Sequence, residues 1–116
     1  MKNNLVQQKS YEFALKVIAL YKELVKQNEF VLSRQMLRAG TSIGANVEEA
    51  LAGQSRADFL SKMAIASKEA RETRYWLRLL KEDCPENKDL DELILLSEEL
   101  IRILTKIILT SKNRNI

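Results

Sequence analysis

The sequence predicts an all-α protein, an antiparallel up-and-down four-helix bundle. Apolar residues recur with a period near 3.6 in four successive segments, a spacing that places them on one side of a helix. The 116 residues include one proline and three glycines, so long helices are favoured over many short strands. The connections between the four segments are brief. Consecutive helices are therefore expected to be antiparallel neighbours in a single domain over residues 1–116.

The helices are expected at about residues 5–27, 34–52, 56–82 and 90–111. Ser33 is a candidate N-cap of the second helix, because its hydroxyl can accept from a free first-turn amide. Gly53 marks the expected end of that helix. Ser55 and Asp58 resemble a capping box before the third helix, and Asp89 begins a similar pattern before the fourth.

The first helix carries an unusually wide apolar stripe. Its two neighbouring rows are Phe13, Val17, Leu20 and Leu24, and Tyr11, Leu15, Ile18, Tyr21 and Val25. A stripe of this width predicts contact with two partner helices rather than one.

The second helix is slim, because small residues dominate its middle. Gly40 and Gly44 lie in the helix interior, where each glycine costs about 1 kcal/mol relative to alanine. The expected gain is the close approach of a neighbouring backbone, which offsets the loss of helix propensity.

Composition argues against catalysis. The sequence has no histidine, the side chain most often used for proton transfer near neutral pH. Cys84 has no basic neighbour and is expected to be a structural thiol. Inward carboxylates for a metal would come from Glu48, Glu49, Glu69 and Glu72, but an ordinary solvated helix surface explains these residues better. We expect no catalytic residue, no metal and no cofactor.

The start of the chain is polar and does not resemble a signal peptide. The sequence contains no uninterrupted run of ~18 apolar residues, the length that a membrane-spanning helix needs. A lone cysteine suits a reducing compartment. A cytoplasmic protein is the expectation.

A basic stripe on the third helix is the first candidate site. It consists of Arg71, Arg74, Arg78 and Lys81, spaced three, four and three apart within about one quadrant of the helix. Such a stripe could follow the phosphates of RNA or DNA. The alternative is an ordinary charged face, in which nearby acids such as Glu69, Glu72 and Glu82 pair with these groups.

Large apolar residues outside the core row are the second candidate site. Ile65, Trp76 and Leu79 lie away from the core row of the third helix, as expected for a contact with a partner. A symmetric homo-oligomer is the simplest form of that contact. Asn46, in the middle of the second helix, could fix the register of the same contact, or could simply be exposed. The less favoured alternative is that Trp76 caps one end of a splayed bundle.

Three motifs resemble a known family. They are Arg38-Ala-Gly-Thr-Ser-Ile-Gly-Ala-Asn-Val-Glu-Glu-Ala50, Ser55-Arg-Ala-Asp-Phe-Leu60 and Lys68-Glu-Ala-Arg-Glu-Thr-Arg-Tyr-Trp-Leu-Arg-Leu-Leu80. Together they resemble the four-helix-bundle proteins encoded within intervening sequences of 23S ribosomal RNA genes, over roughly residues 5–110. That family is similar to the accessory protein of diversity-generating retroelements. This resemblance implies a ring-like homopentamer whose basic surface binds nucleic acid and a reverse transcriptase, and it implies no catalytic residue.

The sequence therefore predicts a non-enzymatic, homo-oligomeric helical bundle that binds RNA or DNA through basic helix surfaces. The alternative hypothesis is a protein–protein scaffold or adaptor with no role in nucleic-acid binding.

Overall fold

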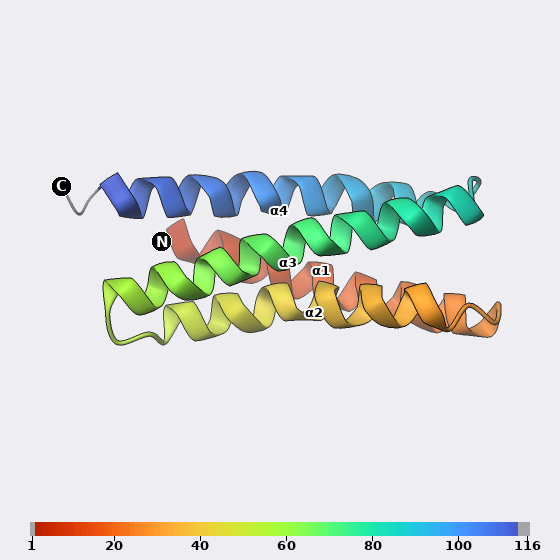
Figure 1. Cartoon of the computed structure of the whole chain (residues 1–116), viewed down its shortest axis with the longest axis horizontal. Coiled ribbons are helices and arrows are strands. Elements are labelled where there is room, and N and C mark those ends of the chain that lie inside the picture. Colours follow the sequence, from red (N-terminus) through yellow and green to blue (C-terminus); the bar gives the residue numbers. More distant parts are fainter. Residues whose placement is uncertain (1, 114–116) are drawn as a thin grey trace.

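The computed structural model describes the backbone of residues 2–113 and the side chains of residues 5–113. The expected domain, residues 1–116, thus includes four terminal residues that lie outside the described part. The chain forms four helices: α1 (Lys2–Lys26), α2 (Val31–Leu51), α3 (Arg56–Asp83) and α4 (Lys88–Asn113). Consecutive helices run antiparallel, so the two ends of the chain lie at the same end of the bundle (Figure 1). The predicted four-helix bundle is confirmed.

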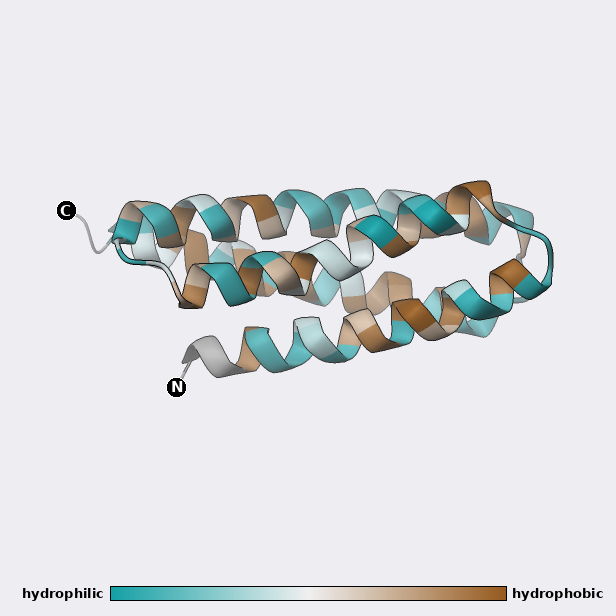
Figure 2. Cartoon of the chain, turned by 90° about the horizontal axis from the view of Figure 1, so that it is seen from below, coloured by the Kyte–Doolittle hydropathy of each residue, from teal (hydrophilic) through white to brown (hydrophobic). Residues whose placement is uncertain are grey.

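The bundle is elongated, with extents of 50 × 21 × 20 Å. Each helix contacts the two helices beside it, and the α1–α4 contact is the least extensive of the four. Hydrophilic and hydrophobic residues alternate along every helix, as amphipathic helices require (Figure 2). Within residues 2–113, no helix combines the length and the apolar character needed to cross a bilayer.

The prediction that Ser33 caps α2 is wrong. The helix begins at Val31, and Ser33 is buried in its first turn, where its hydroxyl donates to the carbonyl of Glu29. The carboxylate of Glu29 takes the capping role, because it accepts hydrogen bonds from the amides of Leu32 and Ser33 at 3.1 and 2.6 Å. Before it, Asn28 adopts a left-handed φ of 65° that turns the chain out of α1.

The starts of the last two helices give one confirmed and one wrong prediction. The Ser55 hydroxyl accepts from the amide of Asp58 at 3.1 Å, as the capping pattern predicted. At α4 the cap is Asn87 rather than Asp89, because the Asn87 side-chain oxygen accepts from the amide of Leu90 at 3.0 Å. Gly53 follows the end of α2 as expected, with Ala52 as the C-cap.

Only one of the two apolar rows predicted on α1 is fully used by the core. Phe13, Val17, Leu20 and Leu24 are all buried. In the neighbouring row, Tyr11 and Leu15 remain 62% and 51% exposed. The helix does contact two partners, α2 and α4, but part of its apolar surface is left uncovered within this single chain.

The predicted approach of a neighbouring backbone is found at Gly44, whereas at Gly40 the close neighbour is a side chain. A Cβ atom on Gly40 would lie 2.9 Å from both terminal methyl carbons of Val17, which is less than real Cβ contacts allow. A Cβ on Gly44 would lie 3.4 Å from the backbone oxygen of Ser10. The two glycines thus let α1 and α2 pack tightly against each other.

Candidate nucleic-acid interface

Of the four cations predicted to form the basic stripe of α3, two have an acidic partner in the structure and two do not. Arg74 donates from Nε to Glu98 Oε2 at 2.8 Å, and Lys81 Nζ lies 3.0 Å from Asp91 Oδ2. Lys81 also donates to carbonyls of the α3–α4 connection. Two of the four cations are therefore neutralised by acids of α4.

The other pair, Arg71 and Arg78, is exposed to solvent. Neither residue forms an ion pair among the described residues. The acids expected to neutralise the stripe from α3 itself do not do so, because Glu72 pairs instead with Arg38 of α2. Arg71 and Arg78 are seven residues apart, so they project from the same side of α3 about 10 Å from each other.

The neighbouring helix adds cations that the sequence stripe did not include. From the Arg74–Glu98 pair, Arg71 lies about 4.5 Å away along α3, and Arg102 lies about 6 Å away along α4. Because the helices are antiparallel, going back from Arg74 to Arg71 and forward from Glu98 to Arg102 leads in the same direction along the bundle. Arg71 and Arg102 therefore lie at the same height along the bundle axis, on adjacent helices. The same reasoning places Lys106 of α4 near the level of Lys68 of α3.

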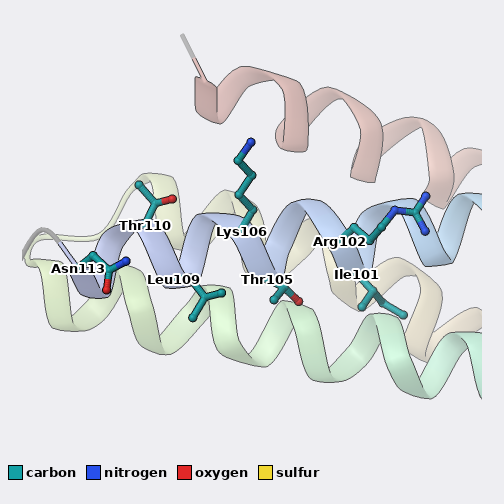
Figure 3. Close-up of a pocket in the computed structure, with 7 residues that line it drawn as sticks. All are labelled: Ile101, Arg102, Thr105, Lys106, Leu109, Thr110 and Asn113. Atoms are coloured by element: carbon teal, nitrogen blue, oxygen red, sulfur yellow. The ribbon is translucent and has the colours of Figure 1, made fainter.

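We call five exposed cations of these two helices the α3/α4 basic face, in which the side chains of Arg102 and Lys106 point away from α3 (Figure 3). Its members are Lys68, Arg71 and Arg78 of α3 and Arg102 and Lys106 of α4. All five are exposed, and within the part of the chain that the structure describes none has an ion-pair partner. Sequence reasoning missed Lys68, Arg102 and Lys106, although Lys68 continues the spacing of Arg71 and Arg78, and Arg102 and Lys106 are one turn apart.

A shallow pocket of about 350 Å³ lies on the outer side of α4, within this face (Figure 3). Its lining residues are Ile101, Arg102, Thr105, Lys106, Leu109, Thr110 and Asn113. Ile101, Thr105 and Leu109 point toward α3, whereas the side chains of Arg102 and Lys106 extend away from it. The pocket thus offers an apolar floor beside two positive charges.

The residues predicted to form a partner contact lie mainly on the α2 side of α3. Ile65 is 37% exposed, and Leu79 is half-buried. Trp76 packs against the core, and its Nε1 donates to Glu72 Oε2 at 3.1 Å. Asn46 is half-buried, and its amide donates to the Ser42 carbonyl in its own helix at 2.9 Å.

The most exposed apolar residues lie elsewhere on the surface. Val31 at the start of α2 is 73% exposed, and Leu95 of α4 is 66% exposed. Tyr11 and Leu15 of α1 form a third apolar surface. The sequence did place Tyr11 and Leu15 in an apolar row, but it could not tell that this row would remain uncovered.

Three of the four carboxylates considered as metal ligands have other partners, whereas Oε1 of Glu69 is buried without a hydrogen-bond partner. Glu48 accepts hydrogen bonds from Gln7, and Glu49 lies 2.9 Å from Lys62 Nζ. In the described range 2–113, no group of three or more acidic or cysteine side chains is arranged to hold a metal ion.

These observations define a small four-helix-bundle protein with a cationic surface on two adjacent helices. The sequence model of the family described as "23S rRNA-intervening sequence protein" matches residues 2–106, so the chain belongs to that family. The resemblance predicted from the motifs of the second and third helices is therefore confirmed.

A solved structure supports this assignment. It comes from Bacteroides thetaiotaomicron VPI-5482 and is described as a protein of unknown function from the S23 ribosomal protein family. This relative is 50% identical to the chain and superimposes with a TM-score of 0.89, covering 93% of this chain and 98% of its own. Among curated proteins, the comparison finds no match.

Proposed function

We propose that this protein is a nucleic-acid-binding module rather than an enzyme, and that it contacts the RNA or DNA backbone through the α3/α4 basic face. The observation that carries the proposal is the presence of five exposed cations without ion-pair partners on two adjacent helices. Lysine and arginine side chains bind phosphates and release the counterions condensed on the strand, which drives binding.

The location of the charge matters more than its sum. The whole chain carries a net charge of only +3, so binding that depended on overall charge would be weak. On the α3/α4 basic face, the nearest acids of α4, Asp91 and Glu98, are already occupied by Lys81 and Arg74. The five remaining cations have no ion-pair partner among the described residues, and the nearest acid on their side of α3 is the exposed Glu82, one turn beyond Arg78.

The family supports RNA as one ligand. Its description refers to an intervening sequence of 23S rRNA, and the solved relative is assigned to a ribosomal protein family. The sequence of the ligand is not specified by this face, since contacts to phosphates carry no base information.

A salt titration tests the proposal. Fluorescence anisotropy with a labelled RNA should show affinity that falls roughly 100-fold between 50 and 200 mM salt if all five cations contact phosphates of a single strand. The double variant Arg71→Gln/Arg78→Gln should weaken binding and reduce the slope of log K against log salt by about 1.4. Arg74→Gln/Lys81→Gln removes the same charge from the ion-paired positions and serves as the matched control. Absence of binding at 50 mM salt would refute the proposal.

We also propose that the protein self-associates, with Ile65, Trp76, Leu79 and Asn46 in or near the contact. Support comes from the partial exposure of Ile65 and Leu79 on one side of α3, and from exposed apolar residues on other helices. Light scattering should give a mass that is a multiple of 13.4 kDa. Leu79→Glu should lower that mass, whereas Tyr11→Glu, on α1, tests whether a different apolar surface is used. A monomeric wild type contradicts self-association.

A protein–protein adaptor without nucleic-acid binding is the second candidate function. Val31 and Tyr11 favour it, because side chains 73% and 62% exposed are large apolar groups with no cover in this chain. The salt titration distinguishes the two functions, because an adaptor without nucleic-acid binding would not bind the labelled RNA.

A further inference from the structure

One aromatic side chain lies within the α3/α4 basic face. Tyr75 is 53% exposed and lies four residues after Arg71 and three residues before Arg78, so all three project from the same side of α3. The Arg71 and Arg78 guanidinium groups are thus placed on either side of an accessible ring. The cations explain binding of phosphates, but they leave this ring without a role.

The ring of Tyr75 is supported from behind by Trp76. The two ring centroids are 5.2 Å apart, and the ring planes are inclined by 67°, an edge-to-face contact. Trp76 is itself held by core packing and by its hydrogen bond to Glu72. Tyr75 is therefore held against Trp76 while about half of it stays exposed to solvent, which suits a stacking platform.

The pocket on α4 provides a second place for a flat group. Its apolar residues Ile101 and Leu109 lie beside Arg102 and Lys106, on the helix adjacent to Tyr75. A base resting against this surface would keep its phosphate near a cation. The α3/α4 basic face thus combines positive charge with surfaces for flat apolar groups on both of its helices.

We propose that the α3/α4 basic face binds single-stranded nucleic acid, with an unpaired base stacked on Tyr75 and the adjoining phosphates held by Arg71 and Arg78. The inference rests on the proposed nucleic-acid-binding function and specifies its ligand. In a duplex the faces of the bases are covered by their neighbours, so an exposed ring on a convex helix gains nothing from them. An unpaired base has an available face and stacks on aromatic side chains whatever its identity.

The test compares four probes at one salt concentration: single-stranded oligo(U) RNA, single-stranded oligo(dT), a mixed-sequence RNA duplex and inorganic polyphosphate. Polyphosphate carries the charge without bases. We expect both single strands to bind more tightly than the duplex or polyphosphate. Trp76 is the only tryptophan, and its contact with Tyr75 makes its fluorescence a reporter. Its emission should change on binding of a single strand but not of polyphosphate.

Variants separate stacking from charge. Tyr75→Leu should weaken single-strand binding about 5- to 150-fold, the loss typical of one stacked base, without changing the salt slope. Tyr75→Phe should restore binding, because the ring and not the hydroxyl is used. Tyr11→Leu removes a similarly exposed tyrosine from α1 and should have no effect. Circular dichroism confirms that each variant is folded.

The outcomes distinguish this inference from the function on which it rests. If Tyr75→Leu binds like the wild type, or if duplex and polyphosphate compete equally with the single strands, the stacking inference is overturned. The loss in Arg71→Gln/Arg78→Gln would then still support nucleic-acid binding. If none of the probes binds at low salt, the proposed function fails, and the inference fails with it.

Discussion

Arg74 of α3 donates to Glu98 of α4 through a contact of 2.8 Å, and this ion pair removes one charge from the surface that α3 would otherwise present. Both side chains are only about one-third exposed, at 37% and 31%. The pair joins the two helices and at the same time limits the α3/α4 basic face to five cations. The carboxylate of Glu98 thus joins α3 to α4 and also lowers the positive charge of the proposed binding surface.

Glu98→Gln should therefore increase affinity for RNA. The substitution frees the Arg74 guanidinium without adding a new group, so one more phosphate contact becomes available. The slope of log K against log salt should steepen by about 0.7 for a single strand. Glu23→Gln is the matched control, because Glu23 pairs with Lys26 within α1, a helix that contributes no residue to this face. Equal gains in affinity from both variants would mean that overall charge, rather than Arg74, controls binding.

The contact between Gly40 and Val17 predicts a loss of stability on Gly40→Ala. The new methyl group would lie 2.9 Å from both terminal methyl carbons of Val17 and 3.3 Å from its Cβ. Rotation of Val17 about its Cα–Cβ bond always leaves at least one methyl against the new group, so α1 and α2 must separate. The free energy of unfolding should fall by about 1–3 kcal/mol from overpacking, partly offset by the better helix propensity of alanine.

Gly44→Ala provides the comparison, measured by the same urea denaturation. Its methyl would make an ordinary van der Waals contact, 3.4 Å from the Ser10 carbonyl oxygen. The gain in helix propensity, about 1 kcal/mol, should therefore leave Gly44→Ala at least as stable as the wild type. If Gly40→Ala is as stable as Gly44→Ala, the close approach at Val17 does not determine the spacing of α1 and α2.

The sequence was sufficient for the bundle but not for the pairing of its charges. The apolar period placed Phe13, Val17, Leu20 and Leu24 in one row of α1, and all four are buried, because core packing requires that period whatever the neighbour. The partners of Arg74 and Lys81 lie 24 and 10 residues away on α4, and no spacing rule within one helix reveals them. Only the antiparallel register of α3 and α4 brings Arg102 level with Arg71.

The helix boundaries differ for a similar reason. Ser33 has the right residue type for an N-cap, but Glu29 reaches forward to the Leu32 and Ser33 amides and allows α2 to begin earlier. Residue preference alone cannot rank these two competing caps, since the outcome depends on the turn made at Asn28.

Glu29→Ala should consequently destabilise the protein by about 1 kcal/mol, the usual cost of losing an N-terminal cap. Two amides in the first turn of α2 would lose their acceptor. Thermal denaturation followed by circular dichroism measures the effect. Glu23→Ala removes an exposed glutamate from the last turns of α1 and should change stability by less than half as much. Equal effects of the two substitutions would show that Glu29 acts through its charge alone.

The ion pair between Lys62 of α3 and Glu49 of α2 predicts a dependence of stability on pH. The hydrogen bond from Lys62 to Glu49, together with the attraction between their charges, raises the pKa of Lys62 above its ordinary value of 10.5. A group whose pKa is raised in the folded state stabilises the fold while it is protonated. This contribution is fully present below the pKa of the unfolded chain and is lost as the pH rises through the pKa of the folded state.

Glu49→Gln should therefore lower the melting temperature slightly at pH 9, and the difference from the wild type should shrink above pH 11. The effect is small, because the pair is open to solvent. Glu48→Gln makes the same change of charge one residue earlier, where the carboxylate accepts from the uncharged Gln7. Its difference from the wild type should not diminish over this pH range in the same way. If both variants follow the same pH curve, the stabilisation comes from net charge and not from the Lys62–Glu49 contact.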